Sequence, residues 1–414
     1  MAIFKRLENK NINKARNQLS KLVDIISNDI SGSVNRQKYQ HFVTSSGGGT
    51  VAVTSSIFQT AYDQNFTYPT ANAFMDLSFG LYQSASFVTS SILGYDAVGK
   101  ALFPSSTLMM REKVDSYRAL ASNLLGDPDL QFSSPFESTN ASDKMQSVLA
   151  LSFRRLFARD KIKKESFATR FLTSINDAAV PTGSNSNLYT VVDAPNVADY
   201  SHVYTDNGSS LLQYSSVSGE VGEIVDSSDT TRKVGLIFYE KGIAIFDVEK
   251  IVTGSQYVTG TIDAVGNATG KIEIGDAANS GGVAQSLSYQ RFVPDFLVSG
   301  SIDNVLDHFG SVRFHSGSTT CLTFQNITSI NSTIINCTLE QDEFNYSSNP
   351  TFRDSEDRIV VIDPGQERTQ QTFTFFTSVG VYDGSGNLLA IAKTSRPIEK
   401  SPEKQINIAI RLQY

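Results

Sequence analysis

The clearest pattern of apolar and polar positions lies at the end of the chain. From residue 406 onward, apolar side chains alternate with polar or small ones, and the apolar set is Ile406, Ile408, Ile410 and Leu412. Successive side chains of a strand leave opposite faces of its sheet, so a period of two predicts a half-buried strand. Residues 372–382 and 388–394 are also predicted to be strands, because each is rich in apolar or β-branched residues and the two flank a Gly-rich turn.

Two more hairpins are predicted in the middle of the chain. Strand-like segments 233–240 and 243–248 flank Lys241-Gly242, and a second pair of short strands lies within residues 256–274. Short Gly-containing turns between two apolar segments are typical of antiparallel hairpins.

Near the N-terminus, apolar side chains recur at alternating steps of three and four, at Ile12, Ala15, Leu19, Leu22 and Ile26. This spacing is that of a helix seam of about two heptads, so a helix is predicted within residues 1–30. Two interpretations stay open. The helix packs on its own domain, or it is an arm that packs on a neighbouring subunit. In the second case, Ile12, Leu19, Leu22 and Ile26 are candidate interface residues.

Two further helices are predicted before residue 175. Residues 109–125 carry a helical stripe and end at Gly126, which suits the position just after a helix. Residues 138–172 begin with N-cap residues, continue with a broad apolar face and end in a basic run that includes Arg154, Arg155 and Arg159. These cations either complement the helix dipole in solvent or form an ion-pairing surface for an acidic neighbouring subunit.

The predicted fold class is α+β and β-dominated, with N-terminal helices followed by antiparallel β hairpin or sandwich domains. The 414 residues allow two to three domains. The long polar stretch 176–230 is typical of functional loops or of loops embedded in an assembly. The expected parts are a helical arm, a mixed and mainly helical domain, a β-rich domain with long polar loops and a C-terminal antiparallel β domain, at residues 1–45, 46–175, 176–300 and 301–414.

The amino-acid composition narrows the classes of binding partner expected for this chain. Charged residues make up 19 % of the chain and the net charge is −7, so the strong basic excess of a general nucleic-acid binder is missing. No apolar run approaches the ~20 residues of a membrane-spanning helix, and no secretory signal is visible. We therefore expect no nucleic-acid partner, no membrane span and assembly in a cytoplasm.

No pattern predicts catalysis, a cofactor or a metal site. Cys321 and Cys337 are expected to be reduced and buried, although their spacing also allows neighbouring strands. Glu273 and Asp276 are too few oxygen ligands for calcium. The acidic clusters at 340–343 and 354–357 are interpreted as solvated turns rather than paired catalytic carboxylates. The four histidines have no metal or triad spacing, and no nucleophile elbow is present.

A resemblance adds to this picture. Residues 343–414 contain Asn349-Pro350, the turn VGVYDGSGNLLAIAK and the ending SRPIEKSPEKQINIAIRLQY. This segment resembles the C-terminal module of structural proteins in the virions of large T-even-like tailed phages, including marine, cyanophage-type ones, and its ending is similar to that of a baseplate wedge protein. VGLIFYEKGIAIF at 234–246 resembles a strand pair of the same proteins. Residues 142–172 more loosely resemble a region in which a helix with an aromatic and basic end leads into a strand, which here corresponds to residues 166–172.

The resemblance implies an architectural role. The expected function is that of a virion structural protein, a baseplate wedge subunit of a contractile tail that acts through subunit interfaces. The implied partners are other phage structural proteins and further copies of the chain in a symmetric assembly. Alternatives are a tail-tip fibre-attachment or receptor-binding protein, a neck protein or another tail component. An enzyme is not expected.

Overall fold

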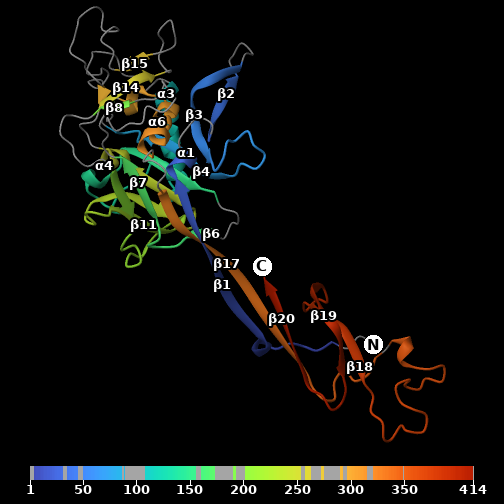
Figure 1. The fold of residues 1–414 in the computed structure, drawn as a ribbon. Helices are drawn as coiled ribbons and strands as arrows, with labels where there is room; N and C mark the ends of the chain where they lie inside the picture. Colours follow the sequence, from blue (N-terminus) through green and yellow to red (C-terminus); the bar gives the residue numbers. More distant parts are fainter. Residues whose placement is uncertain are drawn as a thin grey trace, which may run out of the picture. The chain divides into compact units, whose positions relative to one another are not determined.

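The computed structural model describes residues 4–30, 35–44, 50–85, 88, 108–154, 160–172, 190–192, 201–252, 257–262, 272–274, 290–291, 296–314, 320–347 and 349–413 (Figure 1). The chain divides into two compact units. The large unit is Ser20–Thr328, and the small unit combines Met1–Leu19 with Ser329–Tyr414. Two strands, β1 (Ile12–Ile26) and β17 (Thr320–Leu339), contribute residues to both units.

The large unit is built around one antiparallel sheet that residues 320–328 of β17 join at one end. The order continues through β7 (Ala168–Leu172), β9 (Ser201–Thr205), β11 (Gly219–Asp226), β12 (Lys233–Phe238), β13 (Ile243–Asp247), β5 (Ser147–Phe153), β4 (Ala73–Leu81), β3 (Thr50–Tyr62) and β2 (Arg36–Thr44). Two short strands extend it, β10 (Tyr214–Ser216) beside β11 and β6 (Asp160–Ile162) beside β17. A smaller sheet contains β15 (Ile272–Ile274), β14 (Tyr257–Ile262), β16 (Gln290–Arg291) and β8 (Thr190–Val192).

The central strands of this sheet separate two hydrophobic clusters. Along β5, Leu149 and Leu151 belong to one cluster, whereas Val148 and Ala150 belong to the other. Successive side chains of a strand point to opposite faces, so the two clusters cover the two faces of the sheet. The helices of the unit are α1 (Ser27–Ile30), α3 (Leu108–Leu125), α4 (Val248–Ile251), α5 (Leu297–Ser299) and α6 (Ile302–His308), with a 3-10 turn η3 (Ala141–Asp143) and a π turn η7 (Phe309–Arg313).

Helix α3 shows how sequence and packing agree. Tyr117, Ala121 and Leu124 recur at helical spacing, and all three are buried in the cluster that covers Val148. Gly126 adopts a φ of 87°, a left-handed conformation that suits glycine, and its N–H donates to the Ala121 carbonyl over 3.2 Å. The predicted helix at 109–125 and its predicted end are therefore confirmed.

The small unit contains two β elements. In the first, β20 (Ile406–Gln413) pairs antiparallel with β17, and Ile410 lies opposite the equally buried Ile335. Residues of β1 lie along β17 as well, because the Ser332 hydroxyl donates to the Ala15 carbonyl over 3.3 Å. In the second, β18 (Thr374–Tyr382) and β19 (Leu388–Lys400) form a two-stranded hairpin. The 3-10 turns η1 (Asn9–Asn11) and η8 (Pro350–Phe352) complete the unit.

The expectation of N-terminal helices is wrong, because residues 12–26 form strand β1. Leu19 and Leu22 are 65 % and 58 % exposed, so the apolar seam does not pack as a helix would. The chain hydrogen-bonds to β17 instead, and its backbone groups are satisfied by a neighbouring strand rather than within a helix. The β-dominated, antiparallel part of the predicted fold class holds.

The helix predicted at 138–172 is also wrong. Its described residues form η3, β5, β6 and β7, and only the strand expected at residues 166–172 is present, as β7. The run from Val148 to Leu151 is buried throughout because β5 lies between β4 and β13 with a cluster on each face. A continuous apolar run has no period, so it fits a buried strand as well as a helix.

Candidate interaction surface

The β18–β19 hairpin is rich in apolar residues, yet none of its apolar side chains is buried. No residue of β18 is buried, and β19 buries Lys400 alone. The exposed large apolar side chains of the hairpin are Phe375, Tyr382, Leu388, Leu389 and Ile391. Phe375 is 58 % exposed and Leu389 is 64 % exposed. Exposed apolar groups gathered on one element are typical of an interaction surface rather than of a free face.

Local contacts explain why the chain forms a hairpin here. In the turn, one carboxylate oxygen of Asp383 accepts from the backbone N–H of Asn387 at 2.7 Å and of Ser385 at 2.9 Å. The Asn387 side-chain amide donates to the other oxygen, and these hydrogen bonds hold the pKa of Asp383 below its usual value. At the strand end, the Lys400 ammonium donates to the Asn345 side-chain oxygen and to the carbonyls of Ser401 and Gln341. Hydrogen bonds thus fix the hairpin at both ends, but no hydrophobic core forms along its strands.

The helix-seam residues predicted to form an interface are not brought together. Ile12 is half-buried, whereas Leu19, Leu22 and Ile26 are exposed. In a strand, odd and even positions leave opposite faces, so Leu19 points away from the face that Leu22 and Ile26 share. Because these residues are exposed, β1 stays a candidate contact strand. They do not lie together on one helical surface.

Of the predicted basic residues, the structure describes Arg154 alone, since Arg155 and Arg159 lie outside the described residues. The Arg154 guanidinium is half-exposed and pairs with Asp76 at 2.8 Å. The Thr60 hydroxyl donates to the same Asp76 oxygen over 2.6 Å. Arg154 therefore contacts an acidic residue of its own chain.

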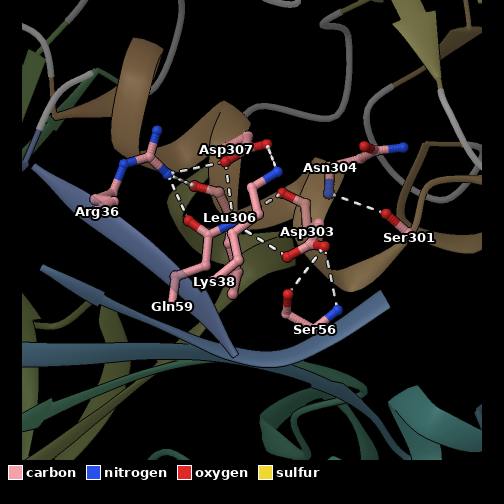
Figure 2. A network of polar contacts seen from close by, with 9 residues as sticks. All are labelled: Arg36, Lys38, Ser56, Gln59, Ser301, Asp303, Asn304, Leu306 and Asp307. Carbon is pink, nitrogen blue, oxygen red and sulfur yellow. Dashed lines mark hydrogen bonds and ion pairs between the residues drawn. The ribbon is translucent and has the colours of Figure 1, made fainter. Parts of the chain in front are cut away.

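The large unit contains a polar network that joins β2 and β3 to α6 (Figure 2). Asp303 and Asp307 lie one turn apart on α6, and Ser301 caps that helix by accepting from the Asn304 N–H over 3.1 Å. Asp303 accepts from the Ser56 N–H at 3.1 Å and from the Ser56 hydroxyl at 3.0 Å.

The Asp307 half of the network carries the cations. One oxygen of Asp307 accepts from Arg36 at 3.2 Å, and the other accepts from Lys38 at 2.7 Å. Gln59 connects the halves, because its amide donates to both carboxylates and its oxygen accepts from Arg36 at 2.6 Å. Burial lowers the pKa of Arg36, and the two carboxylates oppose that effect. Two cations and two carboxylates leave the network neutral, so it fixes the β2–β3 pair to α6 rather than presenting a reactive group.

Other titratable groups of the large unit are also engaged in internal contacts. The His202 ring and Asp226 lie 2.9 Å apart, and the Ser228 hydroxyl donates to Asp226 rather than to the histidine. Burial by itself raises the pKa of Asp226, but the hydrogen bonds from Ser228 and His202 outweigh it and lower the pKa. Burial lowers the pKa of Lys113 to about 7, and its ammonium donates to the Leu297 and Val298 carbonyls, each over 2.8 Å. These contacts orient secondary structure within the large unit.

The acidic clusters lie in turns of the small unit. Glu343 pairs with Lys5, and this contact lowers the pKa of Glu343. Asp354 accepts from the Arg358 side chain at 3.0 Å and from two backbone N–H groups. Cys321 and Cys337 are free and lie on the same strand, β17, not on neighbouring strands. Cys321 is buried as expected, whereas Cys337 is only half-buried. Across the described ranges, no cluster of three potential metal ligands occurs, and no helix reaches the length and apolarity of a membrane span.

Comparisons of the chain with protein-family models, with curated proteins and with solved structures found no match.

The exposed face of the hairpin is not predicted by the sequence pattern. Both strands were predicted, and the structure confirms them. The available signal was the composition of β18: residues 374–382 contain no charged residue and no proline. A strand of that kind at the edge of a sheet is expected to be covered.

Proposed function

We propose that this chain is a structural subunit of a phage virion, a baseplate wedge-type component of a contractile tail that works through contacts with other subunits. The observation that supports an assembly role is the hairpin β18–β19, whose apolar side chains are exposed although its ends are fixed. The virion context rests on the resemblance of residues 343–414 to the C-terminal module of such proteins. That segment includes the whole hairpin and strand β20.

The division of the chain fits this role. The large unit has two hydrophobic clusters and a neutral polar network, so it holds itself together. Between η8 and β18, residues 353–373 have no buried side chain and are held by local hydrogen bonds such as those of Asp354 and Asp363. A segment without a core is stabilised chiefly by what covers it, and stable interfaces between subunits bury large areas.

The test is the composition and electron-microscopy map of purified particles from infected cells. We expect the chain in stoichiometric amounts within the tail, with the small unit buried against neighbouring subunits. Recovery of the chain in the soluble host fraction alone would contradict the proposal. A location at the tip of a fibre, with the hairpin exposed, would favour the receptor-binding alternative.

A further inference from the structure

Strand β1 leaves one of its two edges unpaired. Among the strands that the structure describes, β1 pairs with β17 alone. The part of β1 that belongs to the small unit, residues 12–19, has no buried side chain. The outer side of an edge strand presents backbone N–H and C=O groups, so this part of β1 offers a place where another strand can add to the sheet.

The side chains of this edge select the kind of strand that fits. Lys14 and Arg16 are exposed, and neither forms an ion pair with any residue in the described ranges. Residues two apart leave the same face of a strand, so the two side chains start about 7 Å apart. Cations on an edge oppose pairing with a basic strand, which disfavours β1 of a second copy, and they favour an acidic strand.

Residues 359–367, which we call the acidic segment, have the complementary character. The run from Ile359 to Ile362 consists of four β-branched residues, which favour strands. In the structure this run lies in a turn, with one isolated bridge from Ile359 to Arg353, and none of its side chains is buried. A strand preference that the chain itself does not use is a local conflict of the kind expected at functional sites.

Two carboxylates of the acidic segment are held by neutral groups. Asp363 accepts from the Gln370 side-chain amide over 2.8 Å, and Glu367 accepts from the Gly365 N–H over 3.0 Å. Both side chains are exposed, and neither is ion-paired with a cation in the part of the chain that the structure describes. The acidic segment and the β1 edge therefore carry unpaired charges of opposite sign.

The turn has few hydrogen bonds to exchange. The Val360 N–H donates to the Phe352 carbonyl over 3.1 Å, and the Ile362 N–H donates to the Ile359 carbonyl over 3.1 Å. If residues 359–363 add to β1, the hydrogen bonds of a strand ladder replace these two local bonds. The rearrangement is confined to an exposed segment without a core.

The charge distribution of the chain identifies the occupant as a second copy. Residues 1–19 contain five Lys and Arg side chains and one Glu, whereas residues 340–367 contain eight carboxylates and two arginines. Within one chain, Lys5 pairs with Glu343, which leaves the cations of β1 for a neighbour. A nucleic acid would offer charge without a backbone that pairs with a strand, and the net charge of −7 repels phosphates.

We propose that the acidic segment of one copy adds as a strand to the free edge of β1 in a second copy. Asp363 and Glu367 of the first copy then lie beside Lys14 and Arg16 of the second. Exchange in both directions gives a two-fold dimer, and donation in one direction gives a ring. The inference rests on the proposed assembly role and deepens it, because it names two surfaces and their occupant. It can fail while that role stands.

The first experiment measures self-association of the full chain by sedimentation velocity over a range of concentrations. We expect the native chain to associate, and less so at high salt, because salt screens exposed charges. Lys14→Glu/Arg16→Glu places like charges against the acidic segment, so the dissociation constant should rise about tenfold or more. Lys393→Glu/Arg396→Glu is the matched control, because it alters an exposed Lys and Arg of β19. It should associate like the native chain.

The second experiment tests both surfaces together. Asp363→Lys/Glu367→Lys should also weaken association, because it places like charges against Lys14 and Arg16. An equimolar mixture of this variant with Lys14→Glu/Arg16→Glu should recover association. In the mixture, each variant keeps one native surface that fits the native surface of the other, and the two altered surfaces attract each other. Each variant alone at the same total concentration is the control.

A third comparison separates strand addition from charge attraction alone. Val361→Pro removes a backbone N–H from the acidic segment and should weaken association, because proline cannot donate to a strand ladder. Val361→Thr keeps the N–H and a β-branched side chain, so it should associate like the native chain. Urea unfolding of both variants identifies any general loss of folding. Equal association of the two folded variants would overturn the strand addition.

The outcomes separate this inference from the proposed function. A native chain that stays monomeric, a Lys14→Glu/Arg16→Glu variant that associates normally, or a mixture without recovery would each overturn the contact between copies. If a monomeric native chain enters particles and the Lys14→Glu/Arg16→Glu variant does not, the occupant is an acidic strand of a different protein. If the monomeric native chain instead retards a DNA duplex and this variant does not, the occupant is a phosphate backbone. In the case of a different protein, the second-copy inference falls while the assembly role remains.

Discussion

The β12–β13 pair of the large unit and the β18–β19 pair of the small unit are both antiparallel hairpins, yet their surroundings are opposite. Every residue of β13 is buried, whereas none of β18 is. Strands β12 and β13 lie between β11 and β5 with a hydrophobic cluster on each face. Strands β18 and β19 have no third strand among the described residues. Strand-forming residues therefore define both hairpins, but the position in a sheet decides which one is stabilised by its own chain.

The difference has an energetic consequence. Burying one large apolar side chain stabilises a fold by about 1.5–3 kcal/mol, and an isolated two-stranded hairpin is marginal in water. The large-unit hairpin gains this stabilisation during folding of the chain. The small-unit hairpin gains it when another surface covers it. Matched substitutions in the two regions test this contrast.

The largest effect is expected in the large-unit core. Phe246 on β13 is fully buried, with its ring centroid 5.1 Å from that of Phe171. Phe246→Ala should lower the free energy of unfolding by about 3–5 kcal/mol, because it removes this burial and leaves a cavity. Phe375→Ala should change it by less than about 1 kcal/mol in the dilute chain. Urea unfolding of both variants measures the difference, and equal losses would remove the contrast.

A second comparison concerns ion pairs. Asp307→Ala leaves the buried Arg36 without its carboxylate and should cost about 3 kcal/mol. Asp357→Ala breaks the exposed pair of Asp357 with Arg353 in the small unit and should cost at most about 1 kcal/mol. Thermal or urea unfolding at low and high salt distinguishes the two. A large cost for Asp357→Ala would mean that the small unit holds a packed polar core.

The contributions of the two regions to the free energy of unfolding should also change with pH in opposite directions. Burial raises the pKa of Asp247 to about 7, so the folded chain keeps this proton where the unfolded chain has lost it. Stability from this group is present at low pH and is lost as the pH rises toward 7, by about 2–3 kcal/mol between pH 5 and pH 8. Asp247→Asn should flatten this slope and keep the acceptor that caps α4.

Asp383 in the hairpin turn should act in the opposite direction. Hydrogen bonds from Asn387 lower its pKa, so its contribution is present at neutral pH and is lost as the pH falls below the usual range of a carboxyl group. Unfolding monitored from pH 3 to pH 8 for the native chain, Asp247→Asn and Asp383→Asn checks both signs. The same slope in all three proteins would contradict the assignment.

The sequence predicts those elements whose pattern of apolar and polar residues is set by one neighbouring strand or by one buried face. The alternation at 406–413, the hairpin around Lys241-Gly242 and helix α3 with its Gly126 end all correspond to elements of the structure. Each is specified by side-chain period and turn chemistry within a short segment. Strand β20, with Ile410 buried against β17, shows this most directly.

Elements that depend on distant partners were not predictable in the same way. The three-four spacing of residues 12–26 fits a helix, but pairing with β17, about 300 positions later in the chain, makes these residues a strand. Strand β5 is buried on both faces, so it shows no period. The Asp303 and Asp307 network joins residues more than 240 positions apart, and no local pattern marks it.

The most direct test of the central claim is hydrogen exchange of the β18 amides, measured beside those of β13. In the dilute chain, we expect β18 amides to exchange rapidly and β13 amides to be strongly protected, because one hairpin has a core and the other does not. In assembled particles, β18 should become protected while β13 is unchanged. Equal protection of β18 in the dilute and assembled states would contradict the account.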